Sequence, residues 1–218
     1  FWQQLAAARH HFGDDDGAVD PVDSKVPTIF NDSSAKQMIA GLTSDYKDGD
    51  QGDNTITYHS PSLGSSSFKL GYTKGEGADN VAGSGDIISA SVSTSLGPLS
   101  LSAGSAMHDT AALTASAAAF DSTFITASTT FAGTKIGAGY YDSDYGDNSY
   151  NVGILVPLSG MDLNATYSSH DEQTGHDPSG YMIGIGKSFG YADFTVEYHH
   201  ADLTGAQAGE VDTVRLGY

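Results

Sequence analysis

Residues 66–73 read S-S-F-K-L-G-Y-T, and apolar and polar side chains alternate along them. Phe68, Leu70 and Tyr72 fall on one side of an extended chain, whereas the residues between them are small or polar. Such period-two alternation indicates a β-strand with two different faces. The pattern recurs from residue 55 to the C-terminal end, for example at 149–156 and 191–200. The sequence therefore predicts an all-β protein.

About 11 segments alternate in this way, and their boundaries are good to two to four residues. They are residues 55–60, 66–74, 86–95, 98–107, 122–131, 134–142, 148–157, 160–168, 180–188, 191–200 and 210–218. Short links alternate with long polar links, as Gly97 and then residues 108–121 illustrate. Antiparallel strands with short turns at one end and long loops at the other are typical of outer-membrane β-barrels.

Residues 1–54 do not alternate over a long span, and we expect them to be mostly loop. They include an acidic, turn-rich stretch, D-D-D-G-A-V-D-P-V-D, at 14–23. The chain is therefore divided into a loop segment, residues 1–54, and a β-barrel segment, residues 55–218.

The composition narrows the classes of function. The 218 residues contain no cysteine, and 27 acidic residues against nine Lys and Arg give a net charge of -18. This acidity argues against nucleic-acid binding, because the phosphate backbone needs a basic partner surface. No run of about 18 apolar residues occurs, so no transmembrane helix is predicted. A barrel strand needs only about ten residues with one apolar side.

The two predicted faces of the strands suit lipid on one side and water on the other. The apolar faces carry aromatic residues near strand ends, where interfacial girdles would lie. These are Phe68, Tyr72, Phe131, Tyr140, Tyr167, Tyr181, Tyr198 and Tyr218. The opposite faces are small and polar, as with Ser89, Ser91, Ser93 and Ser95. A soluble two-sheet core would need bulky residues on that side.

No catalytic motif is found. The G-x-S-x-G elbow and the H-E-x-x-H zinc motif are both absent from the sequence. We therefore expect a channel rather than an enzyme. The alternatives are an outer-membrane barrel enzyme or adhesin, and a soluble acidic β-sandwich that binds a partner.

Two acidic segments match each other, D-G-D-Q-G-D-N at 48–54 and D-S-D-Y-G-D-N at 142–148. Alternating Asp side chains around a Gly turn can gather oxygens on Ca²⁺. The candidate ligands are Asp48, Asp50, Asp53, Asp142, Asp144 and Asp147. The final bidentate Glu of the twelve-residue calcium loop is absent, and ordinary turns use the same residues. Turn chemistry is therefore favoured over a structural Ca²⁺ site, and no other cofactor is expected.

The stretch N-T-I-T-Y-H-S-P-S-L-G-S-S-S-F-K-L-G-Y-T, residues 54–73, resembles the Gram-negative general porin family. The matching residues are Asn54, Tyr58, Ser60, Pro61, Gly64, Phe68 and Tyr72. The motif covers about 20 residues, and the strand pattern extends the resemblance over about three quarters of the chain. The final Tyr218 resembles the aromatic residue with which barrel chains end, although Phe is usual there.

The resemblance implies a passive channel of the bacterial outer membrane for small polar solutes and ions, in contact with lipid and lipopolysaccharide and assembled as a homotrimer. It makes residues 55–60 the sixth strand of a 16-stranded barrel, with about five N-terminal strands missing from this sequence. The alternative is one extra strand within residues 1–54, which would give a complete 12-stranded barrel.

The resemblance also implies an inward-folded loop whose carboxylates face a basic wall at the narrowest point of the pore. The acidic candidates are Asp14, Asp15, Asp16, Asp20 and Asp23, and a solvated charge run on a surface loop is the alternative. The cations on the predicted polar faces are Lys69, Lys135 and Arg215. The excess of acid predicts a pore that prefers cations.

Overall fold

A computed structural model describes the chain in several ranges: residues 9–16, 51–74, 86–108, 120–143, 148–171, 177–190, 192–204 and 208–217. The strands are β1 (Arg9–Asp16), β2 (Gln51–His59), β3 (Ser66–Thr73), β4 (Ile87–Leu96), β5 (Leu99–His108), β6 (Phe120–Phe131), β7 (Thr134–Ser143), β8 (Asn148–Leu158), β9 (Met161–Asp171), β10 (Ser179–Ser188), β11 (Asp193–Leu203) and β12 (Gly209–Gly217). No helix with the length and hydropathy of a membrane span occurs among these residues.

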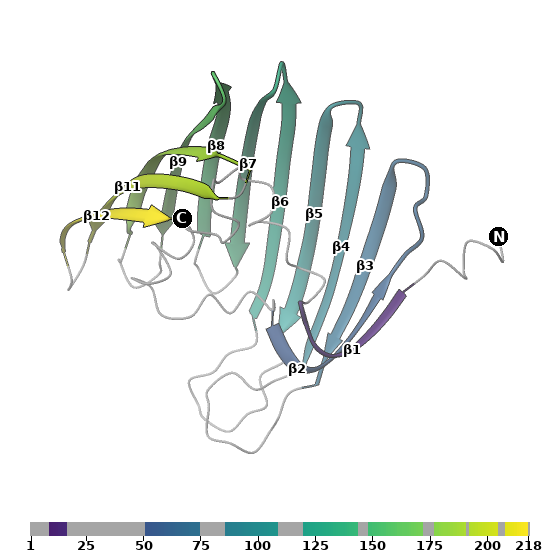
Figure 1. The fold of residues 1–218 in the computed structure, drawn as a ribbon. Helices are drawn as coiled ribbons and strands as arrows, with labels where there is room; N and C mark the ends of the chain where they lie inside the picture. The colour runs from purple at the N-terminus through teal and green to yellow at the C-terminus, as the bar shows by residue number, and fades with distance from the viewer. Residues whose placement is uncertain are drawn as a thin grey trace. The chain divides into compact units, whose positions relative to one another are not determined.

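The strands follow sequence order in a 12-stranded sheet, β1 to β12, and the registered neighbours pair antiparallel (Figure 1). All 11 strands expected from residue 55 onward are present as β2–β12. Their bounds agree with the sequence to within four residues, the largest difference being the start of β2 at Gln51 rather than at residue 55. The all-β, antiparallel prediction is therefore confirmed.

Strand β1 lies within the segment that we expected to be mostly loop. It pairs with β2, from Arg9 opposite His59 to Asp16 opposite Gln51, and the register shifts between Gly13 and Asp15. The strand sequence R-H-H-F-G-D-D-D has one large apolar residue, Phe12, and no period-two alternation, which is why a periodicity argument misses it. The rest of residues 1–50 lies outside the described residues.

Tight turns join the strands at one end. Ala132 and Gly133 both have positive φ, as do Ser159 and Gly160, which is the backbone of a type I′ hairpin. At the other end the chain passes through the long segments between β3 and β4, and between β5 and β6, which lie outside the described residues. These two links are thus two-residue hairpins whose twist suits neighbouring strands, whereas the links after β2 and β10 are longer.

The chain divides into two compact units, which are described separately. The first contains β1–β5 and β6 up to Ile125, and the second contains β6 from Thr126, most of β7, and β8–β12. In each unit the strands have two unlike faces, which we call the apolar face and the polar face.

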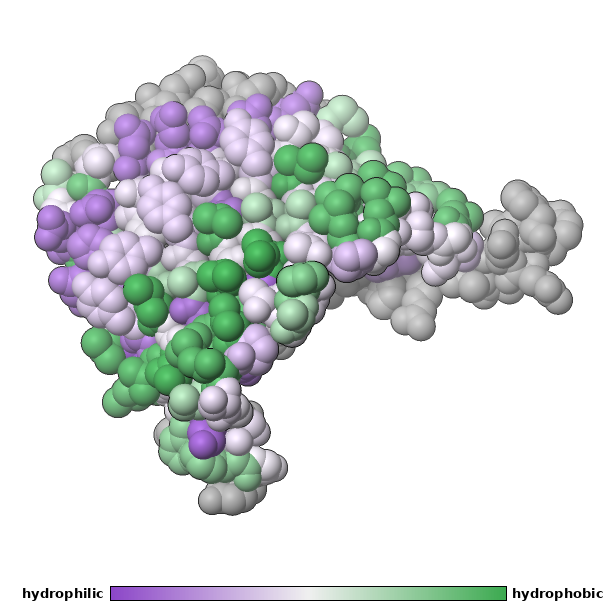
Figure 2. Space-filling model, turned by 90° about the horizontal axis from the view of Figure 1, so that it is seen from above, coloured by the Kyte–Doolittle hydropathy of each residue, from purple (hydrophilic) through white to green (hydrophobic). Residues whose placement is uncertain are grey.

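The apolar face is exposed in both units. In the first unit its large side chains are Ile56, Leu70, Tyr72, Ile88, Val92, Met107 and Ile125. In the second they are Ile136, Tyr140, Tyr150, Val152, Ile154, Tyr167, Tyr181, Ile183, Ile185, Phe194, Val196, Tyr198, Val214 and Leu216. Figure 2 shows hydrophobic residues, in green, gathered in continuous areas beside paler, weakly polar ones.

The polar face is buried in both units. In the first unit its buried residues are Thr57, Thr73, Ser89, Ser102, Ala106, Ser122 and Phe124. In the second they are Thr126, Tyr141, Asn164, Thr166, Ser168, His170, Met182, Thr195, Glu197, His199 and Ala201. In these strands Ile, Leu and Val are exposed, whereas Thr, Ser and Asn on the opposite side are buried. A soluble protein shows the reverse arrangement, with the apolar side chains in its core. A soluble β-sandwich would bury the face that is exposed here, so that alternative is wrong.

Candidate pore-lining face

Small hydroxyl side chains dominate the polar face of the first unit. Strand β4 presents serines at alternate positions, and Ser93 Oγ lies 2.8 Å from Ser102 Oγ on β5. Lys69 of β3 is half-buried and lies opposite Ser91 in register. A face made mostly of Ser and Thr is suited to water, because hydroxyl side chains both donate and accept hydrogen bonds.

Phe124 is the large apolar side chain within this hydroxyl-rich face. Its ring lies directly over Gly104 of β5, since a Cβ added at Gly104 would collide with the ring. Glycine at position 104 therefore leaves the space that the ring occupies. Phe124 is only 4% exposed.

The polar face of the second unit carries a row of unlike side chains across four strands. Asn164 of β9 lies opposite Gly184 of β10, which lies opposite Glu197 of β11, which lies opposite Arg215 of β12. A Cβ added at Gly184 would collide with Asn164 Oδ1 and would lie 2.8 Å from Glu197 Cγ. The missing side chain of Gly184 thus lets Asn164 and Glu197 lean toward each other from the neighbouring strands.

Glu197 and His199 are in contact on this face. They lie two residues apart on β11 and therefore point the same way, and Glu197 Oε2 lies 3.1 Å from His199 Nε2. Their side chains are 0% and 2% exposed. A buried carboxylate needs hydrogen bonds to offset its lost hydration, and His199 supplies one.

Several buried hydroxyl and amide atoms on the polar faces of the two units have no hydrogen-bond partner within the described ranges. They are Thr57 Oγ1, Ser122 Oγ, Thr126 Oγ1, Thr166 Oγ1, Thr195 Oγ1, and both Oδ1 and Nδ2 of Asn164. Buried polar groups in proteins normally have partners in the protein or in ordered water. Hydroxyl and amide side chains of this kind can form hydrogen bonds with ordered water.

The period-two alternation of residues 191–200 puts Glu197 and His199 on the same face, but sequence reasoning did not single them out. The available signal was their two-residue spacing within a strand, together with the opposing Arg215 on the next strand. Asn164 and Gly184 carried no signal of their own, because their contact depends on the register between β9 and β10.

The predicted cations all lie on the polar face but are not brought together in one described cluster. Lys69 is half-buried on β3, and Lys135 is exposed near the start of β7, at a position that alternates with the buried Gly137 and Gly139. Arg215 is half-buried on β12, opposite Glu197.

The predicted acidic residues are described only in part. Asp14, Asp15 and Asp16 belong to the end of β1, whereas Asp20 and Asp23 lie outside the described residues. Their role at a constriction therefore stays a prediction.

The predicted Ca²⁺ ligands are also described only in part. Asp53 belongs to β2 and Asp142 is exposed near the end of β7. The remaining four candidates, Asp48, Asp50, Asp144 and Asp147, lie outside the described residues. Within the described ranges, no group of three or more His, Asp or Glu side chains is placed to hold a metal ion.

Tyrosines of the apolar face cluster near the end of the strands that leads to the long segments. Tyr150 and Tyr167 have ring centroids 5.9 Å apart, and Tyr181 and Tyr198 have centroids 6.1 Å apart. Amphipathic rings favour the boundary between hydrocarbon and headgroups. The exposed tyrosines therefore fit an interfacial girdle, although Tyr218 lies outside the described residues.

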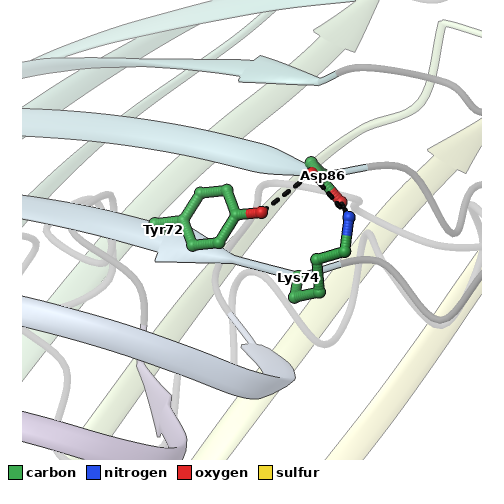
Figure 3. A network of polar contacts seen from close by, with 3 residues as sticks. All are labelled: Tyr72, Lys74 and Asp86. Atoms are coloured by element: carbon green, nitrogen blue, oxygen red, sulfur yellow. Dashed lines mark hydrogen bonds and ion pairs between the residues drawn. The ribbon is translucent and has the colours of Figure 1, made fainter.

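Tyrosine hydroxyls of this girdle donate to carboxylates beside a cation. Tyr72 of β3 donates to Asp86 at 2.8 Å, and Lys74 Nζ donates to both oxygens of the same carboxylate at 2.8 and 2.9 Å (Figure 3). Asp86 holds the pKa of the Lys74 ammonium above its ordinary value, through this hydrogen bond and its charge. Lys74 follows β3 and lies outside the strand.

The second unit repeats the arrangement. Tyr198 donates to Asp212 Oδ1 at 2.6 Å, and His200 Nδ1 lies 2.8 Å from the same oxygen. The phenol ends of the girdle are thus fixed by acids at the rim of the apolar face.

Comparisons with known proteins agree with this geometry. The sequence pattern of the Gram-negative porin family matches residues 6–218. The anion-selective porin from Comamonas acidovorans has a similar structure, with a TM-score of 0.69, 20% identity, and coverage of 94% of this chain and 68% of that chain. No curated protein matches the chain in sequence.

Two further solved structures have the same fold. One is OmpT, an in-vitro folded outer membrane protein of Vibrio cholerae in trimer form, with a TM-score of 0.62, 18% identity, and coverage of 94% of this chain and 72% of that chain. The other is a mutant of the Rh. blastica porin, with a TM-score of 0.61, 18% identity, and coverage of 96% and 72%. The family match extends over nearly the whole chain, and the strands have an exposed apolar face opposite a buried polar one. The chain therefore belongs to the Gram-negative porin family and is an all-β, antiparallel transmembrane barrel protein of the bacterial outer membrane.

Proposed function

We propose that this porin lets small hydrophilic solutes and ions diffuse passively through a water-filled pore and that it prefers cations. The observation that carries the proposal is the opposition of faces on the same strands, with exposed Ile183 next to buried Gly184 and Met182. An apolar band outside and a polar lining inside are what an aqueous channel through lipid requires. No chemical step and no cofactor enter this function.

The charges of the chain support the cation preference. Acidic residues outnumber Lys and Arg by 27 to nine. On the polar face Arg215 lies opposite Glu197, so the positive charge on β12 is matched by a negative one. A pore wall of one sign raises the local concentration of ions of the opposite sign.

The anion-selective porin from Comamonas acidovorans does not decide the selectivity of this chain. At 20% identity the two proteins share a fold, and ion preference depends on the charges that line the pore rather than on the strands that carry them. The acidic balance of this chain is the relevant observation.

We further propose that residues 14–23 belong to the loop that narrows the pore and that Asp14, Asp15, Asp16, Asp20 and Asp23 supply its negative charge. Lys69, Lys135 and Arg215 supply the opposing cations. Such an arrangement would produce a transverse field that orients polar solutes as they pass.

The assembly that we propose is a homotrimer in contact with outer-membrane lipid and lipopolysaccharide. The similar Vibrio cholerae protein was solved in a trimer form. The exposed apolar face offers the surface that both lipid and a second copy would cover. Native mass spectrometry from detergent would show three copies per particle, and a monomer at all concentrations would contradict the trimer.

Planar bilayers test the channel and its selectivity together. The purified protein should insert as stepwise conductance increments. Under a KCl gradient the reversal potential should have the sign that indicates K⁺ permeation over Cl⁻. Absence of conductance from folded protein would refute the channel, and a reversal potential of the opposite sign would refute only the cation preference. Substrate hydrolysis in detergent would favour the alternative of a barrel enzyme.

A further inference from the structure

The tight turn between β10 and β11 carries a small group on the apolar face, Lys187, Phe189 and Phe194, which we call the turn cluster. The Phe189 and Phe194 rings meet edge to face, with centroids 5.6 Å apart and an interplanar angle of 84°. Lys187 Nζ lies 5.1 Å from the centroid of the Phe189 ring. In register, Lys187 lies directly opposite Phe194. The ammonium group therefore lies beside the Phe189 ring, which in turn packs against the Phe194 ring.

The turn cluster belongs to the side of the sheet that meets lipid. Along β10, Lys187 alternates with Tyr181, Ile183 and Ile185, all of them exposed, whereas the glycines between them are buried on the polar face. Phe189 is 48% exposed and Phe194 is 51% exposed. Lys187 is thus a cation on the lipid-facing surface and not a part of the pore wall.

The described carboxylates on the apolar face of β11 and β12 lie at the opposite end of these strands. They are Asp202, Glu210 and Asp212, and Asp202 lies opposite Glu210. Phe194 and Asp202 are eight residues apart on β11, which corresponds to about 27 Å in an extended strand. That separation is too long for an ion pair. At the tight-turn end, Asp162 is placed on the polar face by its register with Gly186.

Lys74, which also lies on the apolar side of its strand, has a different environment. Lys74 lies next to the long segment after β3 and is bound by Asp86. The apolar face thus carries acids and a paired lysine toward the long loops, and a lysine among phenylalanines toward the tight turns. In outer-membrane barrels the tight turns face the periplasm.

We propose that the turn cluster binds a glycerophospholipid of the periplasmic leaflet, with the Lys187 ammonium on the headgroup phosphate and the Phe189 and Phe194 rings against the glycerol and upper acyl chains. A lysine stem lies along apolar surface while its ammonium reaches the headgroups. The cation complements the phosphate, and the exposed rings complement the chain region directly below it. Free phosphate would satisfy only the ammonium, so a lipid fits the whole cluster better.

Native mass spectrometry of the purified full chain tests the proposal, with dioleoylphosphatidylglycerol added to the detergent as the probe. The variant Lys187→Gln removes the charge and keeps most of the side-chain length. Its apparent dissociation constant for the lipid should rise about fivefold, as expected for one lysine at a lipid surface. The matched control Lys74→Gln removes a lysine from the same face at the other end and should leave the dissociation constant unchanged. Phe194→Ala should weaken binding as well.

Three results would overturn the lipid site. They are equal lipid affinity in Lys187→Gln and the parent protein, an equal loss in Lys74→Gln, and full displacement of the lipid by inorganic phosphate, which would indicate a simple anion site. Bilayer conductance measured on the same samples keeps the two proposals separate. Lipid results that go against the turn cluster while conductance persists would leave the channel proposal standing.

Discussion

The Glu197 carboxylate and the His199 imidazole lie 3.1 Å apart on the polar face of β11, and the residue between them, Tyr198, lies on the apolar face and donates to Asp212. Three consecutive residues of one strand thus serve two different environments. The buried pair faces the pore side, and the tyrosine belongs to the girdle. Strand alternation produces this division without any change in backbone direction.

Replacing Glu197 by Gln should weaken the cation preference. A unit charge about 10 Å from an ion in water is worth about 0.4 kcal/mol, or roughly a twofold change in the local concentration of each ion. A twofold change for each ion would change the K⁺/Cl⁻ permeability ratio about fourfold. Screening by salt weakens the interaction, so the ratio should fall about twofold to fourfold. Reversal potentials in planar bilayers measure the ratio.

Asp202→Asn is the matched control for that variant. Asp202 lies on the same strand, and its side chain is 54% exposed on the apolar face. The substitution removes the same unit of charge from the outside of the wall. A ratio unchanged in Glu197→Gln, or shifted equally by Asp202→Asn, would rule out Glu197 as a charge of the pore lining.

Replacing Gly184 by Ala should destabilise the second unit. The new Cβ would collide with Asn164 Oδ1 and crowd Glu197 Cγ at 2.8 Å. Overpacking of this kind costs about 1–3 kcal/mol of unfolding free energy. Urea unfolding in lipid vesicles, followed by tyrosine fluorescence, would measure the loss.

A double-mutant cycle identifies the cause of the Gly184→Ala effect. If the collision with Asn164 causes the loss, Gly184→Ala should cost less in an Asn164→Ala background than in the parent protein. Equal costs in the two backgrounds would show that the strain comes from elsewhere, such as the backbone of β10.

The strand pattern could be predicted almost completely, because in a barrel each strand has its own contrast between lipid and water. Leu70 is exposed and Gly71 is buried simply because consecutive strand residues point to opposite sides. Packing against distant parts of the chain adds little to this difference. The hairpin at Ala132–Gly133 is equally local, because Gly133 adopts its positive φ without steric cost. The exception is β1, whose residues R-H-H-F-G-D-D-D do not alternate between apolar and polar.

From the sequence, the residues of the polar face could be assigned to one side of their strands, but their contacts with one another could not be predicted. Alternation placed Glu197 and His199 together, but their contact depends on side-chain rotamers, and the row Asn164–Gly184–Glu197–Arg215 depends on three strand registers. Register follows from the exact turn lengths, which the sequence fixes only to a few residues. Lys187 escaped notice because its pairing with Phe194 is also a matter of register.

Replacing Asp86 by Asn should lower the pKa of Lys74, because the Asp86 hydrogen bond and charge hold that pKa up. A raised pKa in the folded protein means that the interaction stabilises it fully below the ordinary pKa of Lys74. This contribution is lost as the pH rises through the raised value. The stability difference between parent and Asp86→Asn should therefore stay constant through neutral pH and shrink only in strong alkali.

Carbon NMR of the dimethylated lysines would follow the titration, with Lys74→Arg to identify the signal. The Lys74 signal should titrate at lower pH in Asp86→Asn than in the parent. Identical titration curves in both proteins would show that the contact in Figure 3 is not maintained in solution.

The assignment of lipid and water to the two faces can be tested at neighbouring positions. Leu70 lies in the middle of β3 on the apolar face and is 48% exposed, whereas Ser91 lies on the polar face of the adjacent strand β4. Arg on the lipid face near the bilayer centre costs about 2–4 kcal/mol, because its charge must leave water. Leu70→Arg should therefore fold poorly into vesicles, with a correspondingly lower unfolding free energy.

Ser91→Arg introduces the same side chain on the water-filled side. It should fold into vesicles nearly as well as the parent, because its guanidinium stays hydrated, and it should reduce both the conductance and the K⁺ preference of the pore. Because both variants introduce the same side chain, they compare its cost on the lipid-facing side with its cost on the water-filled side. If Ser91→Arg failed to insert while Leu70→Arg folded normally, the faces would be reversed, and the polar side of these strands would have to meet something other than water.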